Sequence, residues 1–108
     1  MKRIQIDEFR EIWQASKEDN SCCLIDVRTP AEYAEAHVPG ARLLCLDTLA
    51  ARVHEIPKDK DVYLICRSGA RSAQAGNYLI REHGYDRVIN VEGGTMAWMQ
   101  AGHEIETE

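Results

Sequence analysis

The sequence predicts an α/β fold in which a mainly parallel sheet carries helices on both faces, and three observations support this. Short apolar runs alternate with helical patterns along the whole chain, which is typical of strands joined by crossover helices. The run CCLIDV, residues 22–27, is almost wholly apolar, as strands buried on both faces of a parallel sheet usually are. The 108 residues contain no repeat, low-complexity tract or Pro/Gly/Ser-rich linker, so residues 1–108 should form one domain.

The chain should open with a short extended piece, a helix and the buried strand just named. Residues 4–6 are expected to be extended. Asp7 is then in place to cap a helix whose apolar face carries Phe9, Ile12 and Trp13.

The segment RTPAEYAEAHVPGA, residues 28–41, carries a helix start signal. Thr29 and Glu32 have the spacing of a capping box, and Pro30 occupies the first helical position, where proline is favoured. A short helix should therefore begin here and end before Pro39-Gly40.

Residues 42–46 predict a second strand and residues 47–55 a helix, and the polar turn PKDKD precedes a strand over 62–66. A further helix should cover residues 72–83 and stop at Gly84, because glycine is the usual residue after a helix C-terminus.

The segment RVINVEGGTMAW, residues 87–98, predicts the last strand, a sharp turn at Gly93-Gly94 and a helix capped by Thr95. Trp13 and Trp98 should lie in the core, and Glu92 should be an exposed turn carboxylate.

Composition excludes several classes of protein. Hydrophobic residues make up 44% and charged residues 29% of the chain, as in ordinary globular proteins. The formal net charge of −5 argues against nucleic acid or an anionic membrane as a partner. The chain shows no export signal and no apolar run of membrane-spanning length, so we expect a cytoplasmic protein.

The four cysteines have no C-x-x-C pair and the histidines are scattered, so we expect no metal site and no cofactor. Cys22, Cys23 and Cys45 lie in apolar runs without cationic neighbours, which favours packing roles.

Cys66 differs from the other three, because it ends a strand and opens the turn CRSGARS, residues 66–72. In open parallel sheets, ligands bind at the carboxyl ends of the strands. The small residues Ser68, Gly69 and Ala70 let backbone N–H groups converge on the sulfur as an anion nest. Arg67, Arg71 and the start of the following helix, near Ser72, add positive charge. These features favour a nucleophilic thiolate.

Three segments together resemble the rhodanese (thiosulfate sulfurtransferase) family: residues 26–41, the turn at 66–72, and GYDRVINVEGGTMAWMQAG at 84–102. The resemblance covers nearly the whole chain, in the order and spacing of a single-domain member. It implies a rhodanese-like α/β domain that moves a sulfane sulfur as a cysteine persulfide.

The resemblance also implies roles for individual residues. Cys66 matches the persulfide-forming cysteine, and the loop from Arg67 to Ser72 matches the cradle of the transferred sulfur. Asp26 and Arg28 match the family's Asp-x-Arg pair, with Glu32 as the expected partner of Arg28. His37 is expected to order its own loop. The expected partners are a small anionic sulfur donor and a thiol, protein thiol or cyanide acceptor.

Three alternatives remain open at this stage. Cysteine-dependent phosphatases and arsenate reductases also place a thiolate in an anion-binding loop, but their loops resemble C-x5-R, whereas Cys66 and Arg71 form C-x4-R. A non-catalytic binding module of the same fold typically lacks the cysteine. A redox sensor would need Cys45 or Cys23 within reach of Cys66.

Overall fold

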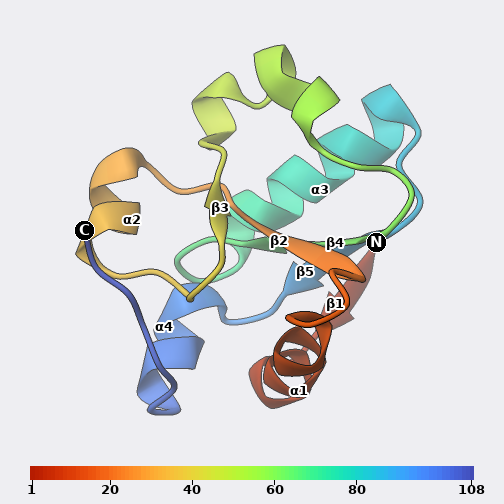
Figure 1. The fold of residues 1–108 in the computed structure, drawn as a ribbon. Coiled ribbons are helices and arrows are strands. Elements are labelled where there is room, and N and C mark those ends of the chain that lie inside the picture. The colour runs from red at the N-terminus through yellow and green to blue at the C-terminus, as the bar shows by residue number, and fades with distance from the viewer.

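The computed structural model describes residues 1–108 as a five-stranded parallel sheet with helices on both faces (Figure 1). The strand order is β1-β5-β4-β2-β3, and β4 is central. The strands are β1 (Lys2–Ile4), β2 (Cys22–Asp26), β3 (Arg42–Leu43), β4 (Asp61–Ile65) and β5 (Val88–Val91). The predicted fold class is confirmed.

Three α-helices and two 3₁₀ segments connect the strands, and a fourth α-helix follows the last strand. They are α1 (Ile6–Ser16), α2 (Pro30–Glu35), η1 (Leu46–Thr48), η2 (Ala50–Glu55), α3 (Ala70–His83) and α4 (Gly94–Gln100). Helices α1 and α4 lie on one side of the sheet and α3 on the other, while α2 lies beyond the end of β2 (Figure 1). No helix has the length and apolar character that crossing a membrane requires.

Each face of the sheet has its own hydrophobic core. Phe9, Trp13 and Trp98 pack on the face covered by α1 and α4. Leu64, Leu79 and neighbouring residues fill the other core, under α3 and the 3₁₀ segments. Successive residues of β4 point into opposite cores, so that Ile65 faces the first core and Cys66 the second. Both tryptophans are buried, as predicted.

The helix signals of the sequence have two outcomes. The capping box is present: Thr29 Oγ1 accepts from the backbone N–H of Glu32, and the Glu32 carboxylate accepts from the backbone N–H of Thr29. Gly84 ends α3 in the left-handed region, as predicted. However, α1 begins at Ile6 rather than after Asp7, and its N-cap, Gln5, makes no side-chain capping bond. Asp7 lies in the first helical turn, where its negative charge interacts favourably with the helix dipole.

The segment after α2 is less regular than predicted. The strand expected over 42–46 ends at Leu43, although Leu44 and Leu46 still donate backbone hydrogen bonds to β2 and the residue after it. The helix expected over 47–55 is present only as the two short 3₁₀ helices η1 and η2, and Arg52 interrupts the second at φ −120° and ψ 16°. Short 3₁₀ segments are common connectors where no strong capping signal fixes an α-helix.

Thr95 was expected to cap α4, and this is wrong. Gly93 is the N-cap, and Thr95 lies inside the helix, 2% exposed, with its hydroxyl unpaired. The helix starts earlier because Gly93 and Gly94 both take positive φ values that glycine allows.

Candidate active site

Cys66 lies at the carboxyl end of the central strand and 1% of it is exposed. Helix α3 begins four residues later, at Ala70, so the intervening loop is very tight. Gly69 makes the turn possible at φ +114°, a conformation that side chains rarely allow. The loop therefore curls back over the sulfur that starts it.

Hydrogen bonds converge on the Cys66 sulfur from this loop. The backbone N–H of Gly69 donates to Sγ over 3.0 Å, and Ser72 Oγ lies 3.3 Å from Sγ. Burial by itself raises the pKa of the Cys66 thiol, but the Ser72 hydroxyl and the backbone N–H groups of Ser72, Gly69 and Ser68 lower it more, so that its pKa lies below the usual value. The loop therefore gives the sulfur one backbone donor and one hydroxyl neighbour, which is the beginning of the predicted anion nest.

Cys23 provides an internal contrast. Burial raises the pKa of its thiol to about 11, with Lys60 opposing the shift through its charge. Cys23 has no nest, so it should remain a thiol at neutral pH. The thiol pKa values of the buried Cys66 and the partly buried Cys23 are thus shifted in opposite directions by their surroundings.

Helix α4 holds the first part of the loop from the side of β5. The backbone N–H groups of Thr95 and Met96 donate to the carbonyl oxygens of Cys66 and Arg67, over 2.8 and 3.0 Å. Gly94 packs against the same carbonyls, because a Cβ built there would lie 2.4 Å from Cys66 O and 2.6 Å from Arg67 O. The glycine is required for this close approach.

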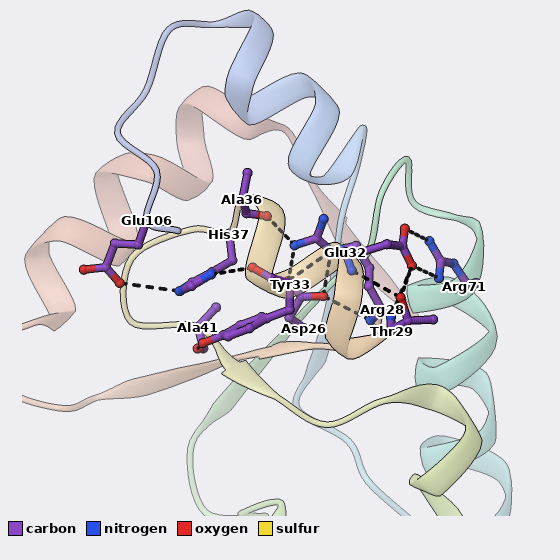
Figure 2. Close-up of polar contacts among 10 residues, drawn as sticks. All are labelled: Asp26, Arg28, Thr29, Glu32, Tyr33, Ala36, His37, Ala41, Arg71 and Glu106. Carbon is purple, nitrogen blue, oxygen red and sulfur yellow. Dashed lines mark hydrogen bonds and ion pairs between the residues drawn. The ribbon is translucent and has the colours of Figure 1, made fainter. Parts of the chain in front are cut away.

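Arg71 was predicted to face an anionic donor, but in the structure it pairs with α2. Its two terminal nitrogens donate to the two carboxylate oxygens of Glu32 over 2.7 and 2.8 Å (Figure 2). The Arg71 hydrogen bond, despite the opposing effect of burial, holds the pKa of the Glu32 carboxyl at about 2. Arg71 therefore ties the loop and the first turn of α3 to the capping box of α2.

Glu32 was expected to pair with Arg28, and this is wrong. Arg28 instead forms a buried bidentate ion pair with Asp26, with nitrogen–oxygen distances of 2.8–3.1 Å, and donates to the carbonyl oxygen of Ala36 over 2.7 Å (Figure 2). Asp26 is the last residue of β2 and lies directly opposite Ile65 of β4. Both predicted supporting residues are therefore beside the loop, but they act as a pair that fixes α2.

Arg67 keeps its guanidinium free. The side chain is exposed and takes part in none of the ion pairs of the structure. It lines a groove between α2 and α4 with a cavity volume of about 570 Å³, whose other walls include Thr95, Met96 and Met99. Of the two loop arginines, Arg67 is the one available to an anion.

His37 orders its own loop, as expected. Its Nδ1 lies 2.7 Å from the carbonyl oxygen of Tyr33, and the two rings are stacked at 3.7 Å (Figure 2). Its backbone N–H and C=O both bond to Glu106, which attaches the C-terminal segment to the end of α2.

The other cysteines are too far from Cys66 to bridge it. Cys23 pairs with Val62, four residues before Cys66 on β4, so the two Cα atoms are roughly 13 Å apart along the strand. Cys45 lies beyond β3, two strand positions from β4, which corresponds to about 10 Å. A disulfide needs Cα atoms within about 7 Å, so neither can resolve Cys66 without movement of the backbone.

One residue near the loop escaped the sequence prediction. Asn90, buried in β5, contacts Gly69 and Ser72. A polar residue inside the apolar run VINV was the signal that could have pointed to it. Glu92, expected to be exposed, is partly buried, and its Oε2 would lie 3.5 Å from a Cβ on Gly69.

Comparisons with known proteins agree with this geometry. A model of the rhodanese-like domain family matches residues 7–101. A sulfurtransferase of Allochromatium vinosum is 51% identical over 82 residues, which are 76% of each chain. The thiosulfate sulfurtransferase GlpE of Tolumonas auensis is 38% identical over 96 residues, or 89% of this chain and 86% of that one. The crystal structure of a rhodanese-like domain protein from Staphylococcus aureus aligns with a TM-score of 0.83 at 35% identity, over 100% of this chain and 99% of that one.

Proposed function

Since the chain belongs to the rhodanese-like domain family, in which its relatives include sulfurtransferases, we propose that it moves a sulfane sulfur from thiosulfate or a persulfide to a thiophilic acceptor through a persulfide on Cys66. The observation that carries this proposal is the loop itself. The pKa of the Cys66 thiol is lowered, and all the hydrogen-bond donors around its sulfur belong to the seven residues 66–72.

The first step is displacement at sulfur. The Cys66 thiolate attacks the outer sulfur of thiosulfate, a new sulfur–sulfur bond forms, and the bond to the sulfite group breaks, so that sulfite leaves with the electron pair. Charge balances, because a thiolate and a dianion give a persulfide anion and a dianion. Arg67 is the loop cation placed to hold the sulfonate end of the donor, and the N–H groups of the nest favour the anionic persulfide that results.

The second step returns the enzyme to its starting state. Cyanide or a thiolate attacks the outer sulfur of the persulfide, takes it as thiocyanate or as a new persulfide, and leaves Cys66 as a thiolate. The cysteine accepts and releases the same sulfur atom, so no metal or organic cofactor takes part and the kinetics should be ping-pong.

The thiosulfate sulfurtransferase of Tolumonas auensis, 38% identical over most of both chains, supports thiosulfate as the donor to try first. A persulfide donor offers the same anionic character and the same electrophilic outer sulfur, so it belongs in the same experiment.

The decisive experiment is to incubate the protein with thiosulfate and, separately, with glutathione persulfide, and to record its intact mass. We expect a gain of one sulfur atom that cyanide removes with release of thiocyanate. Cys66→Ser should gain nothing, and Cys23→Ser is the matched control that should gain normally. If neither donor loads the protein and an aryl phosphate is hydrolysed, the protein is a phosphatase; if neither reaction occurs, it is a binding module.

A further inference from the structure

Asn90 lies beneath the Cys66 loop and is 2% exposed. It belongs to β5, opposite Leu64 of β4, so it comes from the strand next to the one that carries the cysteine. All its side-chain hydrogen bonds go toward the loop or its border: Nδ2 lies 3.2 Å from Gly69 O and 3.4 Å from Glu92 Oε2, and Oδ1 lies 2.5 Å from Ser72 Oγ. None of the steps proposed above uses this residue.

These contacts fix which way the Asn90 amide faces. Gly69 O and the Glu92 carboxylate can only accept hydrogen bonds, so the amide nitrogen must be on their side. The amide oxygen then faces Ser72, and an amide oxygen can only accept. Ser72 must therefore be the donor of the bond that joins them.

The Ser72 hydroxyl has a single proton and three acceptors within reach. Asn90 Oδ1 is 2.5 Å away, Gly69 O 3.2 Å and Cys66 Sγ 3.3 Å. Two oxygens at 2.5 Å need a proton between them, so in this geometry the proton is on the Asn90 side. In this orientation the hydroxyl presents a lone pair to the sulfur, which suits a protonated thiol that donates to Ser72. The effect of Ser72 that lowers the pKa of Cys66 belongs to the other orientation, in which the hydroxyl donates to the sulfur.

We propose that Asn90 is a positioning residue that controls where Ser72 donates its proton: to the Asn90 carbonyl oxygen while Cys66 is a thiol, and to the sulfur once Cys66 is a thiolate or a persulfide anion. The proposal rests on the function proposed above and adds one element to it. The hydroxyl rotates between two acceptors, and Asn90 competes with the sulfur for its proton. When the proton turns to the sulfur, the buried Asn90 oxygen loses its donor, which makes the anion harder to form.

Asn90→Leu adds and removes no charge, but it takes one hydrogen bond from the Glu92 carboxylate. A less shielded carboxylate near the loop would raise the pKa of Cys66, so it cannot account for a fall. The charged groups around the loop come from the loop and the start of α3, from the end of β2 and the residues after it, from α2 and from the turn after β5. They are Arg67, Arg71, Asp26, Arg28, Glu32 and Glu92.

The test measures the pKa of Cys66 from the pH dependence of its alkylation by iodoacetamide, with modification at Cys66 quantified by peptide mass. Asn90→Leu removes the competing acceptor with little change in size. We expect the pKa of Cys66 to fall by about half to one pH unit, since one unit corresponds to a tenfold change in the thiol–thiolate equilibrium. Asn77→Leu, an exposed asparagine on α3, is the matched control and should leave the pKa unchanged.

A merely structural role for Asn90 predicts the opposite sign. If Asn90 only stiffened the loop, its removal would misplace the N–H groups and raise the pKa of Cys66. A raised or unchanged pKa in Asn90→Leu therefore overturns the proposal. Should Asn90→Leu not fold, Asn90→Val, which also lacks the acceptor and suits a strand, decides between the same outcomes.

The dependence on Ser72 gives a second criterion. Ser72→Ala should raise the pKa of Cys66, and in that background Asn90→Leu should no longer lower it. A full effect of Asn90→Leu without Ser72 overturns the proposal. Alkylation of Cys66 does not require sulfur transfer, so its result is independent of the loading experiment. A protein that never accepts sulfur refutes the proposed function. Only the alkylation profiles test the role of Asn90.

Discussion

The two sides of the Cys66 loop are held by different kinds of interaction. On the α2 side, the partly exposed ion pair of Arg71 with Glu32 joins the loop to a helix of six residues. On the β5 and α4 side, neutral hydrogen bonds join it to the buried Asn90 side chain of the sheet and to the backbone N–H groups of Thr95 and Met96 in α4. Charged pairs near the surface respond to pH and salt, whereas buried neutral bonds do not. We call the β5 and α4 side of the loop the fixed wall, because its hydrogen bonds do not depend on pH or salt. We call the α2 side the adjustable wall, because its ion pair does.

Replacing the sulfur that both walls surround should have the largest effect. Cys66→Ser leaves both walls in place but removes the nucleophile, so sulfur transfer should be lost and the thermal midpoint should change little. The measurement is thiocyanate release from thiosulfate and cyanide, with Cys23→Ser as the control. Full activity of the Cys66→Ser variant would show that the Cys66 sulfur is not the reacting atom.

Gly94→Ala should break the fixed wall. The added Cβ would lie 2.4 Å from Cys66 O at φ +59°, and a non-glycine residue in that conformation is destabilising by about 1–3 kcal/mol even without the clash. We expect the loop carbonyls to be displaced from α4 and the activity to fall more than tenfold, since small misplacements of reacting groups are costly in rate. Gly102→Ala, also at positive φ but with open space around it, is the control; equal losses of activity would mean that backbone strain, and not the loop contact, is responsible.

Arg67→Ala tests whether Arg67, the arginine that the adjustable wall leaves unpaired, binds the sulfur donor. Because Arg67 is exposed and unpaired whereas Arg71 is committed to Glu32, its loss should raise the KM for thiosulfate several-fold and leave kcat nearly unchanged. Arg81→Ala, an arginine at the far end of α3, is the control for net charge. An unchanged KM for Arg67→Ala would indicate that Arg71, and not Arg67, binds the donor.

Glu32→Gln should have the smallest effect and should sharpen the pH contrast between the walls. The folded-state pKa of Glu32 is lowered to about 2 from 4.5, so its pairing stabilises the fold above about pH 4.5, and this stabilisation is lost as the pH falls toward 2. We expect the variant to lose no more than about 1 kcal/mol at pH 7, because the pair is partly exposed.

The measurement is urea unfolding at pH 7 and at pH 3. The difference between wild type and Glu32→Gln should shrink at the lower pH. Glu35→Gln, one helical turn further along α2, should show no such convergence. A difference that is constant with pH would mean that Glu32 acts through its capping bonds rather than through its charge.

The sequence was most informative where a residue type has only a few structural uses. The Thr29, Pro30 and Glu32 signal located a helix start, and Gly84 located a helix end, because local backbone chemistry decides both. Cys66 could be singled out because glycine and two arginines surround it within one short turn.

Prediction failed where tertiary contacts decide between several partners. The sequence pattern favoured Arg28, four residues from Glu32, but the fold brings Arg71 of α3 to Glu32 and pairs Arg28 with Asp26. Thr95 looked like a cap because of its type, but the neighbouring glycines moved the helix start. Asn90 is separated from Cys66 by the whole of α3, and only the pairing of β4 with β5 brings them together.

The contacts of Thr95 and Met96 with the loop also have a consequence for the order of biosynthesis. Both residues follow Cys66 by more than the length of α3, and β1 finds its only partner in β5, near the end of the chain. During translation Cys66 therefore leaves the ribosome before the groups of α4 and β5 that hold its loop. We therefore expect the loop to reach its final geometry only when the last strand and helix have joined the sheet.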